Sequence, residues 1–279
     1  MTPLSLSEAI AARSPQHGVS VWWLGQAGFV LRGASATVAI DPFLTDFGSF
    51  GRLYDPPLEP EELDTVDLLL ATHDHADHID PLGFPRILAA SPRATAIVPE
   101  AVRERVVELV GSSDRVRGAS VGTMIEERGV TITPLPAVHG ALPEDGYGFH
   151  RTQGSEYPFL GYAIELDGVR IAHTGDTLVY DGLAERLCAL DLDLLIVPIN
   201  GTSWFREQRG IVGNMNVLEA AELAEASGAR LVVPVHWDLF ADNTEDPENF
   251  LRRLATHHPA VNASVPSIGT RIDLVPANG

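Results

Sequence analysis

The sequence predicts an α/β (or α+β) protein in which helices cover the outer faces of two β-layers. Three observations support this expectation. Short apolar runs lie close together early in the chain, later runs alternate with helical segments, and neither a linker nor a low-complexity stretch interrupts the 279 residues. A chain of this length buries a substantial core. We therefore expect one domain over residues 1–279.

The expected strands are short runs rich in β-branched and aromatic residues. Asp167 and Gly168 separate two of these runs, and this residue pair is favoured in two-residue hairpins. The early strands follow one another as a meander, whereas the later ones are joined through helices. The runs cover residues 19–24, 28–31, 36–40, 66–71, 94–98, 130–134, 161–166, 169–172, 194–197 and 230–235.

Helices are expected where capping residues precede an apolar repeat. Asn216 with Glu219 three residues later forms a capping-box pattern, and Gly228 provides the stop signal. Asp246 and Pro247 occupy the N-cap and first-turn positions of a later helix. The expected helices cover residues 5–13, 101–110, 217–227 and 247–256, with a further helical stretch at 182–190.

Composition limits the partners and the location of the protein. A formal net charge of −19 repels polyphosphate, so no nucleic-acid partner is expected. No apolar stretch reaches the length of a membrane span, and no signal peptide is recognised, so we expect a cytoplasmic protein. The single cysteine, Cys188, excludes an intrachain disulfide and is expected to be a small buried apolar residue. A homo-oligomer is compatible with the sequence.

The residues that carry chemistry are concentrated directly after the apolar run 68–70. Burial of so many histidines and aspartates costs several kcal/mol unless they are paired or bind metal. Imidazole and carboxylate ligands suit Zn²⁺, Mn²⁺ or Fe²⁺, and the absence of thiolates favours an open catalytic site over a structural zinc site. The segment reads Thr72-His73-Asp74-His75-Ala76-Asp77-His78-Ile79-Asp80.

Within this segment, the spacing separates two groups of ligands. His73 and His75 project to the same side of an extended chain. Asp77 and His78 are adjacent at a turn into the next helix and can face a second metal ion a few Å away.

The remaining ligands are predicted from their position at the ends of apolar runs. His139, Asp176 and His236 each follow such a run, and strand ends at one edge of a layered α/β protein converge. A hydrogen-bonded core histidine is the alternative for His139 and His236. Beside the first motif we favour metal binding, with Asp176 as the bridging carboxylate.

In this order, the residues resemble the metallo-β-lactamase superfamily: His73-x-His75-x-Asp77-His78, then His139, Asp176 and His236, with Asp41 ending an early strand. The resemblance implies a four-layer αβ/βα sandwich with a dinuclear metal site at one edge of the two sheets. It assigns His73, His75 and His139 to one ion. It assigns Asp77, His78 and His236 to the other, with Asp176 shared.

Further motifs resemble the L-ascorbate-6-phosphate lactonase group of that superfamily. This resemblance implies a metal-dependent hydrolase with two divalent ions, zinc or manganese, whose shared hydroxide attacks a small lactone or ester, with or without a phosphate group. Asp77 is the expected catalytic residue, because it can orient the hydroxide and receive its proton. The motifs are Trp22-Trp23-Leu24-Gly25, Arg209-Gly210-Ile211, Met215-Asn216 and Pro234-Val235-His236-Trp237-Asp238.

Two alternatives stay open. The segment 198–237 also resembles N-acyl-phosphatidylethanolamine phospholipase D, a phosphodiesterase, and the chain is short between Asp41 and Thr72 for the lactonase. A module that binds iron and hydrolyses nothing is the second alternative.

Several residues near the predicted ligands have two interpretations each. We expect the aspartates to orient ligands or cap the loop; they are Asp41, Asp74 and Asp80. His173 either supports a ligand or packs in the core. The arginines either bind an anion or face solvent; they are Arg151, Arg206 and Arg209. The aromatic bands 47–54 and Trp204-Phe205 either wall a pocket or pack in the core.

Overall fold

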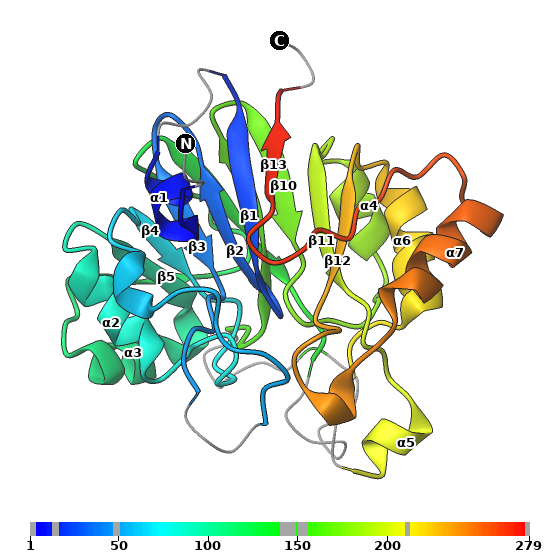
Figure 1. Ribbon diagram of the computed structural model, residues 1–279, viewed down its shortest axis with the longest axis horizontal. Coiled ribbons are helices and arrows are strands. Elements are labelled where there is room, and N and C mark those ends of the chain that lie inside the picture. Colours follow the sequence, from blue (N-terminus) through cyan, green and yellow to red (C-terminus); the bar gives the residue numbers. More distant parts are fainter. Residues whose placement is uncertain are drawn as a thin grey trace.

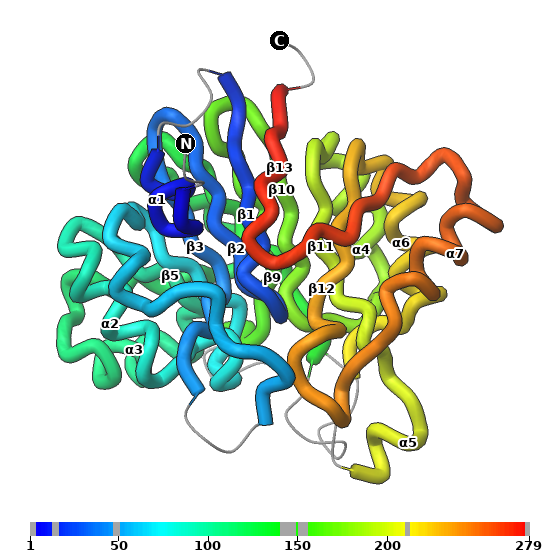
Figure 2. The backbone as a smooth tube through the Cα atoms, in the orientation of Figure 1, coloured from blue at the N-terminus to red at the C-terminus, as the bar shows by residue number. Residues whose placement is uncertain are grey.

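Two mixed sheets stack face to face, with helices covering both outer faces, as the sequence predicts (Figure 1). The structure is a computed structural model that describes residues 4–12, 17–46, 51–139, 149, 156–209 and 213–276. In Figure 2, β1 and β13 run side by side toward the end of the sandwich at which the chain starts and finishes. The long loops that carry the predicted ligands lie at the opposite end.

The first sheet combines an antiparallel meander with parallel strands. Strands β1 to β3 are antiparallel, β3 to β6 are parallel, and β13 pairs with β1. Its order is β13-β1-β2-β3-β4-β5-β6. The bounds are β1 (Val19–Gly25), β2 (Gly28–Arg32), β3 (Thr37–Ile40), β4 (Leu68–Leu70), β5 (Thr95–Pro99), β6 (Val116–Ala119) and β13 (Arg271–Leu274).

The second sheet repeats that plan, with antiparallel strands first and parallel strands after them. Strands β7 to β10 are antiparallel neighbours, and β10, β11 and β12 are parallel. Its order is β12-β11-β10-β9-β8-β7. The bounds are β7 (Ile125–Glu127), β8 (Val130–Pro136), β9 (Leu160–Leu166), β10 (Val169–His173), β11 (Leu194–Pro198) and β12 (Val232–Val235).

Helices complete the outer layers. One apolar cluster joins α1, α2 and α3 to the first sheet, and another joins α4, α6 and α7 to the second. The bounds are α1 (Leu6–Ala11), α2 (Gly83–Ala90), α3 (Arg103–Val110), α4 (Leu183–Cys188), α5 (Trp204–Glu207), α6 (Val217–Ser227) and α7 (Pro247–His257), with 3₁₀ turns η1 (Pro60–Glu62), η2 (Glu100–Val102) and η4 (Ala241–Asn243).

Strands buried on both faces explain the continuous apolar runs. On β3, Val38 and Ile40 face the core between the sheets, whereas Ala39 faces the helices. Because both faces are covered, every residue of this strand is buried. The parallel strands therefore end in loops that gather at one edge.

The predicted strands and helices are present, with small shifts at their ends. The hairpin at Asp167 and Gly168 is confirmed, since both residues have positive φ. The structure adds α2, α5, β6, β7 and β13, whose sequence signals are weak. The burial predicted for Cys188 is wrong: on α4, Leu183 and Leu187 point into the core while Cys188 is exposed. Among the described residues, no helix is long and apolar enough to cross a membrane.

Candidate metal centre

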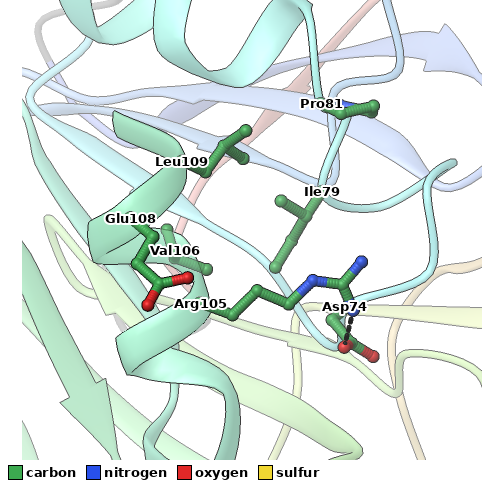
Figure 3. A pocket seen from close by; sticks show the side chains of 7 residues that line it. All are labelled: Asp74, Ile79, Pro81, Arg105, Val106, Glu108 and Leu109. Atoms are coloured by element: carbon green, nitrogen blue, oxygen red, sulfur yellow. Dashed lines mark hydrogen bonds and ion pairs between the residues drawn. The ribbon is translucent and has the colours of Figure 1, made fainter. Parts of the chain in front are cut away.

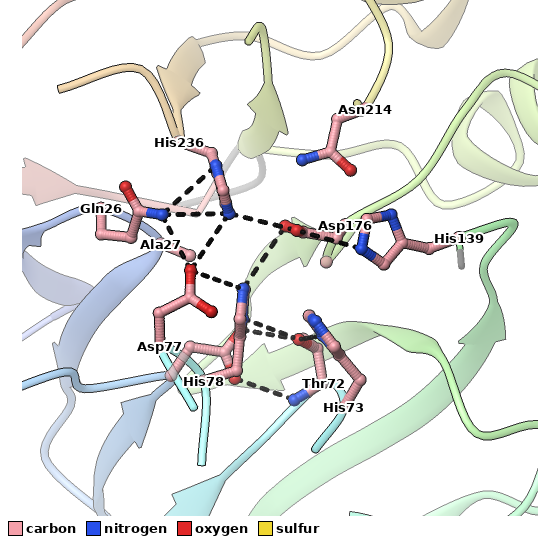
Figure 4. Close-up of polar contacts among 12 residues, drawn as sticks. Gln26, Ala27, Thr72, His73, Asp77, His78, His139, Asp176, Asn214 and His236 are labelled. Atoms are coloured by element: carbon pink, nitrogen blue, oxygen red, sulfur yellow. Dashed lines mark hydrogen bonds and ion pairs between the residues drawn. The ribbon is translucent and has the colours of Figure 1, made fainter. Parts of the chain in front are cut away.

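The predicted ligands meet at one edge of the sandwich (Figure 4). Four loops supply them, one from the first sheet after β4 and three from the second sheet after β8, β10 and β12. The loop after β4 carries His73, His75, Asp77 and His78, and the other three carry His139, Asp176 and His236. The structure thus brings all seven residues together, as expected from the convergence of strand ends.

Buried aspartates hold the loop after β4 in place. Asp41 accepts hydrogen bonds from the Thr72 amide at 2.8 Å and the Thr72 hydroxyl at 2.7 Å, and its Oδ2 lies 2.7 Å from His78 Nδ1. Asp80 accepts bonds from the amides of Leu44 and Thr45 and from the amide of Gly83 at the start of α2. Both carboxylates orient the loop, as predicted, and neither belongs to a ligand group.

His73, His75 and His139 form what we call the first triad. One ring nitrogen from each lies within 4.8 Å of the others. All three imidazoles surround the ring of Phe159, with centroid separations of 5.4, 5.8 and 5.3 Å. An apolar aromatic ring therefore sets the packing of this group.

Asp77, His78 and His236 form the second triad, whose ligand atoms also lie within 4.8 Å of one another. Asp77 Oδ2 lies 3.6 Å from His78 Nε2 and 3.4 Å from His236 Nε2. Gln26 Nε2 donates to Asp77 Oδ2 at 2.9 Å. Polar groups therefore surround the second triad, whereas the aromatic ring of Phe159 packs against the first.

Asp176 lies between the two triads. Its oxygens are 3.1 Å from His236 Nε2, 3.6 Å from His78 Nε2 and 3.7 Å from His139 Nε2. It also forms a third ligand group with His73 and His78. This placement is the one expected of a shared carboxylate.

Unpaired buried nitrogens show that the residues fit metal ions. Among the described residues, His73 Nε2 and His78 Nε2 are buried without a hydrogen-bond partner. A buried polar atom left unpaired costs about 1–3 kcal/mol, and coordination removes that cost. With only nitrogen and oxygen ligands, the donor set suits zinc, manganese or iron.

The two triads differ in their affinity for protons. Burial lowers the pKa of His139 to about 3, and it also lowers the pKa of His73 and His75. Burial acts the same way on His236, but attraction to Asp176 and hydrogen bonds to that carboxylate outweigh it and raise the pKa to about 10. The pKa of His78 is raised as well, because its carboxylate neighbours outweigh the effect of burial.

Comparison with known proteins agrees with this geometry. The sequence profile of the beta-lactamase superfamily domain matches residues 36–237. The chain belongs to that superfamily. A protein of Thermococcus onnurineus named UPF0173 metal-dependent hydrolase is 34% identical over 234 residues, which are 83% of this chain and 90% of the relative. A protein of the same name from Archaeoglobus fulgidus is 30% identical over 232 residues, or 83% and 89%. The chain is therefore a UPF0173-family metal-dependent hydrolase.

Solved structures share the fold at low identity. Igni18, a metallo hydrolase from Ignicoccus hospitalis, superposes with a TM-score of 0.67 at 22% identity, over 91% of this chain and 97% of the other. An isothiocyanate hydrolase from Delia radicum gut bacteria also reaches 0.67, at 16% identity, over 92% and 99%. Both confirm the predicted metallo-β-lactamase fold.

Two further predicted positions of this UPF0173 protein lie away from the ligand groups. His173 is a core histidine: its Nε2 lies 2.9 Å from the Ala27 carbonyl, and its Nδ1 accepts from the Gly175 amide. Asp74 points outward and forms an ion pair with Arg105 (Figure 3). Both residues line a separate cavity of about 340 Å³. That cavity is lined by Asp74, Ile79, Pro81, Arg105, Val106, Glu108 and Leu109.

The arginines and aromatics near this edge have other roles than the ligands. Arg206 donates to the carbonyls of Gly201 and Thr244, and Arg209 pairs with Asp242. Trp204 and Phe205 on α5 are 66% and 71% exposed and do not pack in the core. Arg151 and residues 47–50 lie outside the described part of the chain.

The sequence reasoning missed two contacts of the UPF0173 site: Gln26 touches the second triad, and Phe159 packs on the first. Tyr54, from the predicted aromatic band 47–54, donates to Asp238 near His236. The signal available for Gln26 was its place between two expected strands, directly after the Trp22-Trp23-Leu24-Gly25 motif. Gln26, Asp41 and His236 have positive φ, a conformation that non-glycine residues adopt rarely.

Proposed function

We propose that the protein hydrolyses small lactones or related esters and that each triad holds one divalent ion, zinc or manganese, with Asp176 shared. The observation that carries this proposal is the overlap of the three ligand groups. His73 and His78 each belong to two of them, so the groups form one continuous centre. Two ions this close suit a reaction in which one positions the nucleophile and the other polarises the bond to be broken.

Bound there, two divalent ions supply a water ionised near neutral pH and positive charge for the developing oxyanion. The protein's own groups then set orientation and proton movement. The side chain of Asp77 is 18% exposed, compared with 5% for Asp176 and 0% for His78, so it is the carboxylate open to an incoming molecule. We assign Asp77 the role of receiving the proton of the attacking water while it stays a ligand.

The described cations favour an uncharged electrophile over a phosphate. Arg206 donates to two backbone carbonyls, which leaves it no bidentate face for a phosphate group. Arg209 is exposed and lies 3.7 Å from Asp242, in a weak surface pair. A lactone or carboxylic ester needs no such anchor, and this supports carbon rather than phosphorus as the electrophilic atom.

The test is a substrate panel on the metal-loaded chain: several lactones, an aryl carboxylic ester, a bis-aryl phosphodiester and an aryl isothiocyanate. We expect hydrolysis of a lactone or ester that disappears on chelation and returns with zinc or manganese. Selective turnover of the phosphodiester would instead establish the phosphodiesterase alternative. If the protein hydrolyses none of these compounds and is coloured when loaded with iron, the result would support the alternative of an iron-binding module without hydrolytic activity.

A further inference from the structure

Gln26 is a buried polar side chain in the turn between β1 and β2. Only 2% of the residue is exposed, and its φ is 51°, in the left-handed region that non-glycine residues rarely occupy. A long amide in such a place needs partners, because a buried unpaired polar group is costly. Its partners are two residues of the second triad.

The Gln26 amide spans Asp77 and His236 (Figure 4). Its Nε2 donates to Asp77 Oδ2 at 2.9 Å and lies 3.0 and 3.3 Å from the two ring nitrogens of His236. An ionised carboxylate only accepts hydrogen bonds, so the amide nitrogen, rather than its oxygen, faces Asp77. The side chain therefore links a carboxylate ligand to an imidazole ligand that comes from the other sheet.

The backbone of Gln26 is fixed to the same loop. Its N–H donates to Asp238 Oδ1 at 3.1 Å, and its carbonyl accepts from the His236 amide at 3.2 Å and from Trp23 Nε1 at 3.1 Å. Asp238 is held in turn by the hydroxyl of Tyr54. The backbone of the turn and the His236 loop are thus joined at two points, which compensates for the unfavourable φ of Gln26 and of His236.

We propose that Gln26 is a positioning residue for the second triad. Its side chain holds Asp77 Oδ2 through a hydrogen bond, and its backbone carbonyl holds the His236 amide, so that both residues keep the arrangement that binds a metal ion. Among the described residues, its side chain contacts only Asp77 and His236 of the seven predicted ligands, so the first triad is expected to be independent of it. The proposal rests on the proposed two-ion function and adds a prediction of which ion Gln26 controls.

The experiment is a Co²⁺ titration of the metal-free full-length chain, followed by visible absorption and calorimetry. For the wild type we expect two binding steps. Gln26→Met keeps the length of the side chain and removes the donor, and loss of such an outer hydrogen bond weakens metal affinity by about 10–100-fold. We expect that loss in one step only.

Gln26→Glu gives an effect of opposite sign. A carboxylate at this position cannot donate to Asp77 and repels it, so the metal-free protein is destabilised, and a divalent ion relieves the repulsion. The rise in melting temperature on adding Co²⁺ should exceed that of the wild type, whereas for Gln26→Met it should fall short. If Gln26→Met folds poorly, the rise in melting temperature of Gln26→Glu on adding Co²⁺ still tests the proposal.

The matched control is Arg105→Met, which removes the partner of Asp74 on the outer side of the ligand loop and should leave both steps unchanged. Equal weakening of both steps in Gln26→Met, or changes of the same sign in the Met and Glu variants, would overturn the proposal. A wild type that binds no Co²⁺ would instead contradict the proposed function. The two failures are therefore distinguishable.

Discussion

The two triads are built from similar ligands but from different surroundings. The three histidines of the first triad pack around Phe159, and burial keeps them neutral. The second triad has carboxylates on several sides, with Asp41 behind His78 and Asp176 beside both its histidines. One group is therefore prepared for a metal mainly by burial against an aromatic ring, and the other mainly by neighbouring carboxylates and hydrogen bonds.

Among the described residues, three of the six non-glycine residues with positive φ lie at the second triad and none lies in the first. Asp41, Gln26 and His236, which have positive φ, all belong to or contact the second triad. Each such conformation costs on the order of 1–3 kcal/mol and persists only where the surroundings impose it. The second triad thus requires more tertiary support than the first.

The largest effect should come from the residue that joins the triads. His73 belongs to the first triad and to the group with His78 and Asp176. We expect His73→Ala to lower the metal content below two ions per chain and the hydrolysis rate by about a thousandfold, since metal catalysis supplies several kcal/mol. Elemental analysis and rates on the best substrate measure this. The exposed His257→Ala is the control, and two retained ions with full activity would refute the shared role.

Loss of support behind the second triad should have the next largest effect. Asp41→Asn removes the anionic acceptor of His78, a buried pair whose disruption costs about 3 kcal/mol of folding stability. Metal affinity at one step should fall by about 10–100-fold. The same substitution at Asp74, which pairs with Arg105 on the outer side of the loop, should change stability by less than about 1 kcal/mol. Urea unfolding and a Co²⁺ titration compare the two variants, and similar outcomes would remove the distinction between them.

A smaller effect is expected from the aromatic support of the first triad. Phe159→Leu keeps an apolar side chain and should cost about 1.5 kcal/mol of unfolding free energy, with metal affinity reduced only a few-fold at one step. Phe84→Leu, on the buried face of α2, should cost similar stability and leave both binding steps unchanged. If Phe159→Leu also spares both steps, the ring only fills space.

The sequence singled out the seven predicted ligands, which the structure brings together, but little of what supports them. His139, Asp176 and His236 could be chosen because each follows an apolar run, and parallel strands end at one edge. Gln26 also follows an expected strand, but an amide is not a usual ligand of zinc or manganese and a phenyl ring is none, so residue type singled out neither Gln26 nor Phe159. Gln26 meets His236 across 210 residues, a contact that only the fold determines.

The edge strand β13 and the helix α2 were missed for a related reason. Strand β13 reads Arg-Ile-Asp-Leu and has only Leu274 buried, so it lacks the continuous apolar run of the central strands. Helix α2 starts with Gly-Phe-Pro, a poor helix-forming sequence, and is fixed instead by Asp80, which accepts from the amide of Gly83. Tertiary contacts decide both elements.

The last prediction separates the triads by pH. With a pKa of about 10, His236 holds a proton at neutral pH in the metal-free protein, and a metal ion must displace it. One binding step should therefore strengthen by about tenfold per pH unit between pH 6 and 8 for each proton released. His139, with a pKa of about 3, is already neutral across that range, so the other step should vary little. Calorimetric Co²⁺ titrations in buffers of different ionisation enthalpy count the protons. If both steps release the same number, the contrast between an apolar and a charged triad does not control metal binding.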